Sequence, residues 1–169
     1  MGAKTQWLDG RFRFNLTAFM YDYTDLQVQQ ALRQGVVVIN NAASADVKGA
    51  EVEIRALIAS RLEMSASATY LDATYDEFPD SEVPEALAEY LIGDPNYDPS
   101  VGEAGGYNAA GKRLSNAPEF AYAVAARFTQ PVARGELYLL GNYRWQDRTD
   151  FDPSNADIVS EPAYGLLTV

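Results

Sequence analysis

The stretch that decides the fold covers residues 40–75 and reads NNAASADVKGAEVEIRALIASRLEMSASATYLDATY. Glu51 and Glu53 occupy alternate positions in it, and the residues between and beyond them are alanine, valine and isoleucine. Alternation with a period of two predicts a β-strand that has one apolar and one polar face. A second alternating run follows over 62–70, so the stretch predicts a β-hairpin. Gly49 lies on the same predicted face as the two carboxylates.

The same alternation recurs along the chain, over 11–27, 118–129 and 136–148. The run 11–27 would reach roughly 55 Å, because a strand rises about 3.3 Å per residue. A strand in a globular protein has about 5 or 6 residues, and a membrane-spanning strand needs about 9 to 11. We therefore expect strands that cross a bilayer and project beyond it.

The predicted connections between these runs alternate in length. Short connections are expected at 8–10, 59–61 and 130–135, and long ones at 28–36, 78–112 and 152–162. Short turns on one side and long loops on the other are typical of an outer-membrane barrel. In the longest loop, 81–93 predicts a short helix, with Ser81 as its cap, Pro84 early in it and Gly93 at its end.

Aromatic residues collect near the predicted strand ends. Those expected on the long-loop side are Tyr21, Tyr23, Tyr70, Tyr75, Tyr143, Trp145 and Phe151, and those expected on the short-turn side are Trp7, Phe12 and Phe128. Two such bands predict the interfacial girdles of a membrane barrel. The alternative is that aromatic residues are common in any strand.

Composition excludes several classes of function. The chain of 169 residues carries 24 acids against 13 bases, a net charge of -11 that argues against nucleic acid as a partner. It has no cysteine and no histidine, which removes disulfides, thiolate nucleophiles, imidazole bases and most transition-metal sites. We expect no enzyme, no cofactor and no metal. The longest aliphatic runs have about four residues, too few for a membrane-spanning helix, and the opening MGAKTQW has no apolar signal region.

Five segments, in this order, resemble the C-terminal half of the β-barrel of TonB-dependent outer-membrane receptors. They are FMYDYTDLQVQ (19–29), INNAASADVKGAEVEI (39–54), SASATYLDATYDEF (65–78), GKRLSNAPEFAYAVAARF (111–128) and AYGLLTV (163–169). The resemblance implies a barrel of roughly 22 strands with a globular plug inside it. Residues 1–169 would be a partial barrel domain, with the plug, the TonB box and the final strands outside this sequence.

The resemblance sets the expected fold and function. The fold is all-β, an antiparallel up-and-down meander of about seven long strands that forms an open, curved segment of a large barrel with two unpaired edges. The function is active uptake of a scarce ligand, such as an iron-siderophore, cobalamin or a glycan, across the outer membrane of a Gram-negative bacterium. The partners are the lipid bilayer, the receptor's own plug, the TonB complex through the N-terminal region, and the cargo.

Polar residues on the predicted strands are candidates for a wall that faces the lumen and the plug. They are Gly49, Glu51, Glu53, Arg55, Asn142, Arg144 and Arg148. Two carboxylates at alternate positions lie roughly 7 Å apart and could serve as a catalytic pair, but a polar lumen wall is the favoured interpretation. Gly49 marks either a β-bulge or a place where the plug backbone approaches closely. Arg144 and Arg148 either contact cargo or pair with nearby acids, and Trp145 should face lipid.

The longest loop carries the acids Glu82, Glu85, Glu89, Asp94, Asp98 and Glu103. Carboxylates can bind calcium, but the segment DPNYDPS lacks the regular ligand spacing of a calcium loop, so a solvated acidic loop is favoured. An acidic loop facing the ligand would suit neutral or cationic cargo.

Two other functions share the alternation of apolar and polar residues. One is a different outer-membrane barrel, such as a porin or an autotransporter translocator, and the other is a soluble β-sandwich binding module. The sandwich predicts that the apolar face packs against a second sheet. A barrel predicts that this face forms an exposed band, which a soluble monomer could not maintain.

Overall fold

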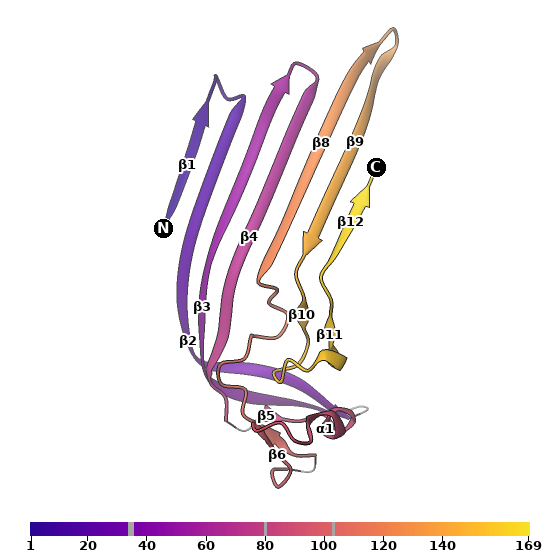
Figure 1. Cartoon of the computed structure of the whole chain (residues 1–169). Coiled ribbons are helices and arrows are strands. Elements are labelled where there is room, and N and C mark those ends of the chain that lie inside the picture. Colours follow the sequence, from indigo (N-terminus) through magenta and orange to yellow (C-terminus); the bar gives the residue numbers. More distant parts are fainter. Residues whose placement is uncertain (34–35, 80, 103) are drawn as a thin grey trace.

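The computed structural model describes residues 1–33, 36–79, 81–102 and 104–169, except for the side chains of 28–33, 36, 38 and 40–43. Its main element is one seven-stranded antiparallel sheet in the order β1-β2-β3-β4-β8-β9-β12. The strands are β1 (Gly2–Trp7), β2 (Phe12–Arg33), β3 (Val36–Ala59), β4 (Leu62–Glu77), β8 (Phe120–Val132), β9 (Gly135–Gln146) and β12 (Tyr164–Thr168). Neighbours in sequence are neighbours in the sheet, so the predicted all-β meander is confirmed. β1 and β12 form its two open edges (Figure 1).

The short connections lie together at one end of the sheet and the long ones at the other (Figure 1). We call these the turn end and the loop end. The loop end holds small elements: a three-stranded sheet, a two-stranded sheet and two short helices. They are β5 (Ser81–Glu82), α1 (Glu85–Leu91), β6 (Tyr97–Asp98), β7 (Gly106–Tyr107), β10 (Thr149–Asp150), η1 (Asp157–Val159) and β11 (Ser160–Glu161).

The loop expected at 28–36 is a strand instead. β2 continues to Arg33 and β3 begins at Val36, and residues 34–35 lie outside the described part of the chain. The backbone pairing of β2 and β3 persists along this extension, and Val36 opens a run of β-branched residues that favours a strand. Figure 1 shows the extended hairpin bending sharply and running across the loop end.

β2 has an unusual backbone conformation at Asp25. Its φ is 56°, in the left-handed region that residues other than glycine rarely adopt. Thr24 pairs with Ser44 and Leu26 pairs with Ala42 on either side of it, so the register is kept across this position. Aspartate is among the residues that tolerate this conformation best.

The buried core lies in the loop end and not under the sheet. Its members are Tyr75, Phe78, Val83, Leu87, Leu91, Tyr107 and Ala109. The large apolar residues of the sheet are exposed by contrast, with Leu137 at 63% and Leu139 at 62%. No second sheet covers them in the described part of the chain, so the β-sandwich alternative is wrong.

The short helix in the longest loop is confirmed, but not its predicted cap. α1 starts after Pro84, which occupies the N-cap position without a side-chain hydrogen bond, while Ser81 belongs to β5. Gly93 follows the helix with φ 94°, as expected for a residue that ends one. Among the described residues, no helix is both long enough and apolar enough to cross a membrane.

Candidate functional site

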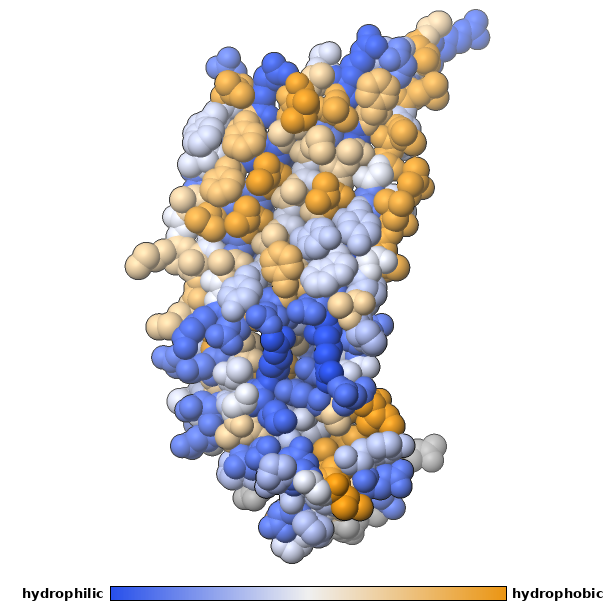
Figure 2. Space-filling view, in the orientation of Figure 1, coloured by the Kyte–Doolittle hydropathy of each residue, from blue (hydrophilic) through white to orange (hydrophobic). Residues whose placement is uncertain are grey.

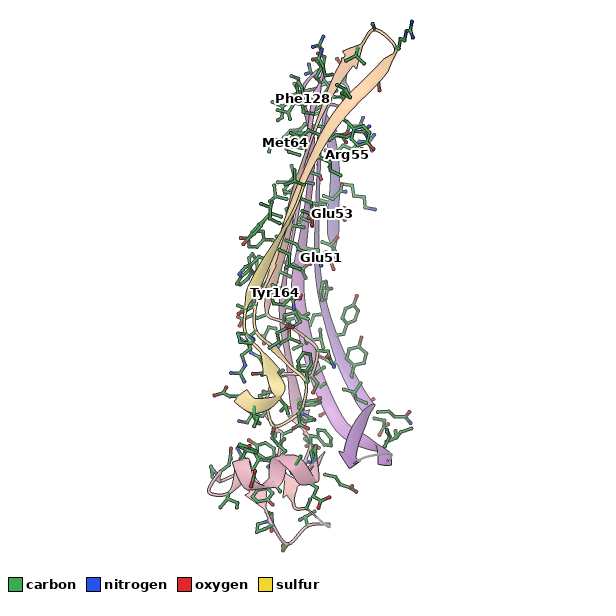
Figure 3. The ribbon with its side chains drawn as sticks, turned by 90° about the vertical axis from the view of Figure 1, so that its right-hand side faces the viewer. Glu51, Glu53, Arg55, Met64, Phe128 and Tyr164 are labelled. Carbon is green, nitrogen blue, oxygen red and sulfur yellow. The ribbon has the colours of Figure 1, made fainter. Side chains whose placement is uncertain are left out.

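The register of the sheet places the candidate wall residues on one face. Asn15, Glu53, Ser67, Ala123 and Arg144 lie side by side across the five strands from β2 to β9. The adjacent row on the same face contains Arg13, Arg55, Ser65, Ala125 and Asn142. Figure 3 shows Glu51, Glu53 and Arg55 on one side of the sheet and Met64 and Phe128 on the other.

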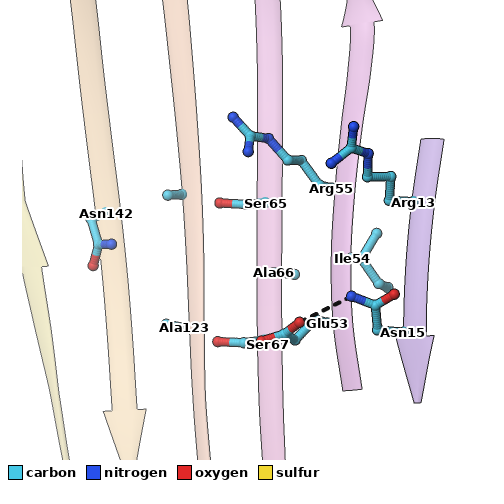
Figure 4. Close-up of a pocket in the computed structure, with 11 residues that line it drawn as sticks. Arg13, Asn15, Glu53, Ile54, Arg55, Ser65, Ala66, Ser67, Ala123 and Asn142 are labelled. Atoms are coloured by element: carbon cyan, nitrogen blue, oxygen red, sulfur yellow. Dashed lines mark hydrogen bonds between the residues drawn. The ribbon is translucent and has the colours of Figure 1, made fainter. Parts of the chain in front are cut away.

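This polar face is hollowed. A depression of about 470 Å³ extends over β2, β3, β4, β8 and β9 and is lined by Arg13, Asn15, Glu53, Arg55, Ser65, Ser67, Ala123, Ala125 and Asn142, with Ile54 and Ala66 (Figure 4). A hollow across five adjacent strands is expected where a sheet curves around its inner face. We therefore call the face that carries Glu53 the concave face and the face that carries Met64 the convex face.

Small side chains form the floor of this hollow. β4 contributes Ser65 and Ser67, and β8 contributes Ala123 and Ala125. A second hollow of about 320 Å³ continues toward the loop end, where Arg144 and Tyr164 join the lining. The concave face is thus a shallow polar trough with a small-residue floor and longer side chains at its margins.

Several charged groups of the concave face have no ion-pair partner. Asn15 donates a hydrogen bond from Nδ2 to Glu53 Oε2 at 3.1 Å, and Arg55 pairs with Glu63. Within the described residues, Arg13, Glu51 and Arg144 make no side-chain hydrogen bond or ion pair. Exposed, unpaired charges of both signs fit a polar wall open to water or to a partner. They do not fit an acid–base pair buried in a catalytic cleft.

Arg148 lies apart from the other candidates. It follows the end of β9, and its Nε donates to Asp150 Oδ1 at 2.8 Å while its second Nη donates to the carbonyl oxygen of Asn155, also at 2.8 Å. Asp157 is its other ion-pair partner. Hydrogen bonds to Asp157 and Asp150 raise the pKa of Arg148. Its role in the structure is to clamp the loop between β9 and β12.

Gly49 does not mark a β-bulge. It pairs with Phe19 on one side and Leu71 on the other without a register shift. A Cβ atom at position 49 would lie 2.5 Å from Cζ of Phe19 and 2.7 Å from the carbonyl oxygen of Tyr70. The Phe19 ring fills the space over the glycine. The β-bulge interpretation is therefore wrong, while an approach of the plug at this position stays a prediction.

The loop acids are dispersed. Asp94 accepts a hydrogen bond from the Tyr107 hydroxyl at 3.1 Å, and Asp98 accepts two from Ser100. These two hydrogen bonds lower the pKa of Asp98, the one from the Ser100 side chain more than the one from its backbone. Glu85 and Glu89 are exposed and Glu82 is half-buried in β5, while Glu103 lies outside the described residues. The described part of the chain holds no group of acids arranged for a metal ion.

The convex face carries an apolar band that ends in aromatic residues. Figure 2 shows hydrophobic side chains over the turn-end part of this face, paler rings across its middle and hydrophilic side chains toward the loop end. Tyr122 stacks on Trp145 with ring centroids 5.7 Å apart, and Phe120 lies 6.1 Å from Trp145. At the turn end Trp7 stacks on Phe12 at 5.7 Å. Along β4 the band runs from Leu62 to Tyr70, about nine residues, which matches a membrane-spanning strand.

The predicted girdles are therefore right in part. Trp7, Phe12, Phe128, Tyr70 and Trp145 belong to the convex face toward the ends of the band, whereas Tyr143 lies on that face in the middle row, beside Val124. Tyr75 is instead buried in the core of the loop end, and Phe151 is exposed in a loop. Tyr21 and Tyr23 fall on the concave face, because they alternate in register with Thr17 and Phe19. Phe120 and Tyr122 were not among the predicted girdle residues, although alternation along β8 places them on this face.

The two faces exchange their character beyond the aromatic rows. On the convex face, Lys48 lies between Met20 and Asp72, and the next row contains Asp22 opposite Asp46. On the concave face the polar residues give way to uncharged rows, which are Phe19–Gly49–Leu71, Tyr21–Val47–Ala73 and Tyr23–Ala45–Tyr75. A strand that leaves the bilayer needs this exchange, because its outer face then meets water.

Comparison with known proteins identifies the architecture. Residues 1–169 match the family described as TonB dependent receptor-like, beta-barrel. Among solved structures, the chain resembles the siderophore receptor PiuA from Acinetobacter baumannii, with a TM-score of 0.68 and 17% identity. It also resembles BauA, the ferric preacinetobactin receptor of the same organism (0.63 and 17%), and FyuA, the ferric yersiniabactin uptake receptor from Yersinia pestis (0.66 and 14%).

The chain covers only part of these proteins. In each case 98% of this chain aligns with 20% of the other, so it spans about a fifth of their length. At these identities the structures establish the fold, and the family match over every residue establishes the relationship. The family match replaces the alternative interpretations of the chain as a porin or an autotransporter translocator. The open curved sheet, its band of exposed apolar residues and the match over its whole length show that this chain belongs to the β-barrel of the TonB-dependent receptor family.

Proposed function

We propose that residues 1–169 form one arc of a large barrel in an active transport receptor of the Gram-negative outer membrane, and that the receptor takes up a scarce ligand with energy from TonB. Members of the family are transporters and not enzymes. The observation that carries the proposal is the pair of faces, an apolar band on the convex side and a polar trough on the concave side. Lipid would contact the first and the receptor interior the second.

The concave face suits a plug domain as its partner. Its floor of serine and alanine lets another backbone come close, and Arg13, Glu51 and Arg144 offer charges that are not satisfied within the described residues. A plug with complementary charges would pair with them. Gly49, Glu53, Arg55 and Asn142 would belong to the same wall, Gly49 only through the Phe19 ring above it.

The cargo we favour is a neutral or cationic ferric chelate. Two of the similar structures are receptors for named ferric chelates, preacinetobactin and yersiniabactin, and the third is a siderophore receptor. The acidic loop, with Glu82, Glu85 and Glu89 on or beside α1, would repel an anionic chelate and tolerate a neutral or positive one. Cobalamin and glycans are the other cargo classes of this proposal.

Uptake by the intact receptor tests the proposal. A strain deleted for the full-length gene, complemented with it or with an empty vector, is given radiolabelled iron on neutral, cationic and anionic chelates. We expect accumulation only with the gene and only while TonB is functional, with the anionic chelates poorest. Uptake that persists in a strain lacking TonB would contradict active transport, and uptake of none of the chelates would direct the search to cobalamin and glycans.

A further inference from the structure

We propose that Arg61, with Gln130 beside it, binds the phosphate of an anionic phospholipid at the turn-end edge of the apolar band. The inference goes beyond the proposed function and rests only on the band being the face that meets the membrane. Arg61 directly precedes Leu62, the residue at which the band ends on β4. A cation at that height meets lipid headgroups, because apolar rows lie on one side of it and the turn lies on the other.

A hydrogen bond holds the Arg61 side chain on the lipid side of the sheet. Nη1 of Arg61 donates to Oε1 of Gln130 at 2.7 Å. Gln130 comes two residues after Phe128 on β8, so it shares the convex face with Phe128, which Figure 3 shows near the turn end. Gln130 is itself fixed, because its Nε2 donates to the carbonyl oxygen of Pro131 at 3.1 Å. Arg61 as a whole is exposed, so the guanidinium is anchored on one side and open to an acceptor on the other.

Within the described residues, no acid competes for this guanidinium on the convex face. The two convex rows nearest to Arg61 on β4, β8 and β9 contain leucine, phenylalanine and glutamine and no carboxylate. Glu63 and Glu136 are close in sequence to these rows but lie on the concave face, and Glu63 already pairs with Arg55. A partner of Arg61 must therefore supply the negative charge itself.

The loop end of the band has the opposite surroundings. Lys48 is a convex-face cation beyond the aromatic rows there, and its Nζ lies 3.6 Å from Oδ2 of Asp46. Lys48 also pairs in register with Asp72, and Asp22 lies opposite Asp46. Three carboxylates around one ammonium group repel a phosphate. Selectivity for an anionic headgroup should therefore belong to the turn end, at Arg61.

A phospholipid fits both halves of this surface. Its phosphate can accept N–H groups from a guanidinium, and its acyl chains would continue over the apolar rows that begin at Leu62 and Phe128. A soluble anion would gain nothing from those rows. A zwitterionic headgroup fits less well than an anionic one, because its ammonium group finds no carboxylate near Arg61.

Native mass spectrometry of the full-length receptor in detergent micelles tests the proposal. The probes are dioleoylphosphatidylglycerol and dioleoylphosphatidylcholine, which share their acyl chains and differ in headgroup charge. We expect the receptor to retain the first more strongly, and Arg61→Gln to weaken its binding about fivefold, the usual contribution of one arginine at a membrane surface. Gln130→Glu should weaken it similarly while leaving the arginine in place, because the new carboxylate would pair with the guanidinium.

Lys48→Gln and Arg134→Gln are the matched controls. Each removes one exposed cation, the first at the acidic end of the band and the second at the tip of the β8–β9 hairpin, beyond the band. Neither should change the binding of phosphatidylglycerol, and heat-modifiable mobility on gels shows that each variant is folded. Equal retention of the two lipids, unchanged binding in Arg61→Gln, or an equal loss in Arg61→Gln and the controls would overturn the inference. The measurement needs neither cargo nor TonB, so its failure would leave the proposed function standing, whereas a failure of uptake would count against that function alone.

Discussion

At the scale of single residues, the arrangement of Gly49 and Phe19 shows how a glycine is accommodated in the middle of a long strand. A strand glycine leaves a gap over the backbone, and here the neighbouring aromatic ring closes it. The same arrangement recurs on the convex face, where the Tyr143 ring lies over Gly165, the hydroxyl oxygen being 2.2 Å from the site of a Cβ atom. In both cases the absence of a side chain is what lets the ring lie flat.

We therefore expect Gly49→Ala to destabilise the receptor by about 1–3 kcal/mol, the usual cost of overpacking. The added methyl group would meet the Phe19 ring and the Tyr70 carbonyl oxygen. Urea unfolding of the full-length receptor in lipid vesicles measures the change. Gly141→Ala is the control, because no atom lies within 4 Å of its Cβ position, and it should be neutral or stabilising by about 0.5–1 kcal/mol. Equal effects at the two sites would contradict the account.

At the scale of elements, β2 contains one left-handed backbone conformation within its extended hairpin with β3. Asp25 has φ 56°, and a β-branched residue is the least able to adopt it. We expect Asp25→Val to destabilise the extended hairpin by roughly 1–2 kcal/mol and Asp25→Gly to preserve it. Hydrogen exchange of the backbone amides of residues 18–27 measures the difference, with Asp22→Val as the control in ordinary strand. Protection unchanged by Asp25→Val would refute the role of this conformation.

The longest loop supplies most of the core of the loop end and should unfold separately. Leu87 on α1 is only 2% exposed within that core, so Leu87→Ala should cost about 2–5 kcal/mol of local stability. Limited proteolysis of intact cells should then cleave within 78–112 while the barrel remains folded. Ile92→Ala is the matched control, since Ile92 is 76% exposed directly after the helix. Simultaneous loss of loop and barrel would show that the two unfold as one unit.

At the scale of the whole molecule, the band on the convex face predicts how the receptor sits in the bilayer. Val124 lies in the middle row of the band, and Leu137 lies beyond its turn-end limit. A lysine at the midplane of a barrel costs about 2–4 kcal/mol, and one near the interface about 0–1 kcal/mol. We therefore expect Val124→Lys to lower the free energy of unfolding more than Leu137→Lys does, when unfolding is measured in vesicles. The reverse order would place the membrane elsewhere on the sheet.

Much of this architecture could be predicted from the sequence, because a period of two fixes the face of every strand residue. The faces of Glu51, Glu53 and Trp145 followed from it directly. The left-handed conformation of Asp25 and the strand in place of the loop at 28–36 could not be predicted, since the first is a single backbone angle and the second depends on pairing between two strands. The alternation also predicts that Tyr21 and Tyr23 lie on the concave face. Nearness to a strand end, which placed them in a girdle, does not distinguish the two faces. The surroundings of Gly49 depend on Phe19, which is distant in sequence, and those of Arg148 depend on the fold of a loop that the alternation does not predict.

The exchange of polarity between the faces has a mechanical consequence for the receptor. A shift toward the cell interior by one side-chain pair, about 7 Å along a strand, would bring Lys48 and Asp72 into hydrocarbon. An equal shift outward would carry Tyr70 and Phe120 past the headgroups into water and draw the polar turn residue Arg61 into hydrocarbon. Both movements raise the free energy, so the strands fix the depth at which the barrel lies in the bilayer. A thicker bilayer must then thin locally around the receptor, or the strands must stand more upright, because the barrel cannot slide to accommodate it.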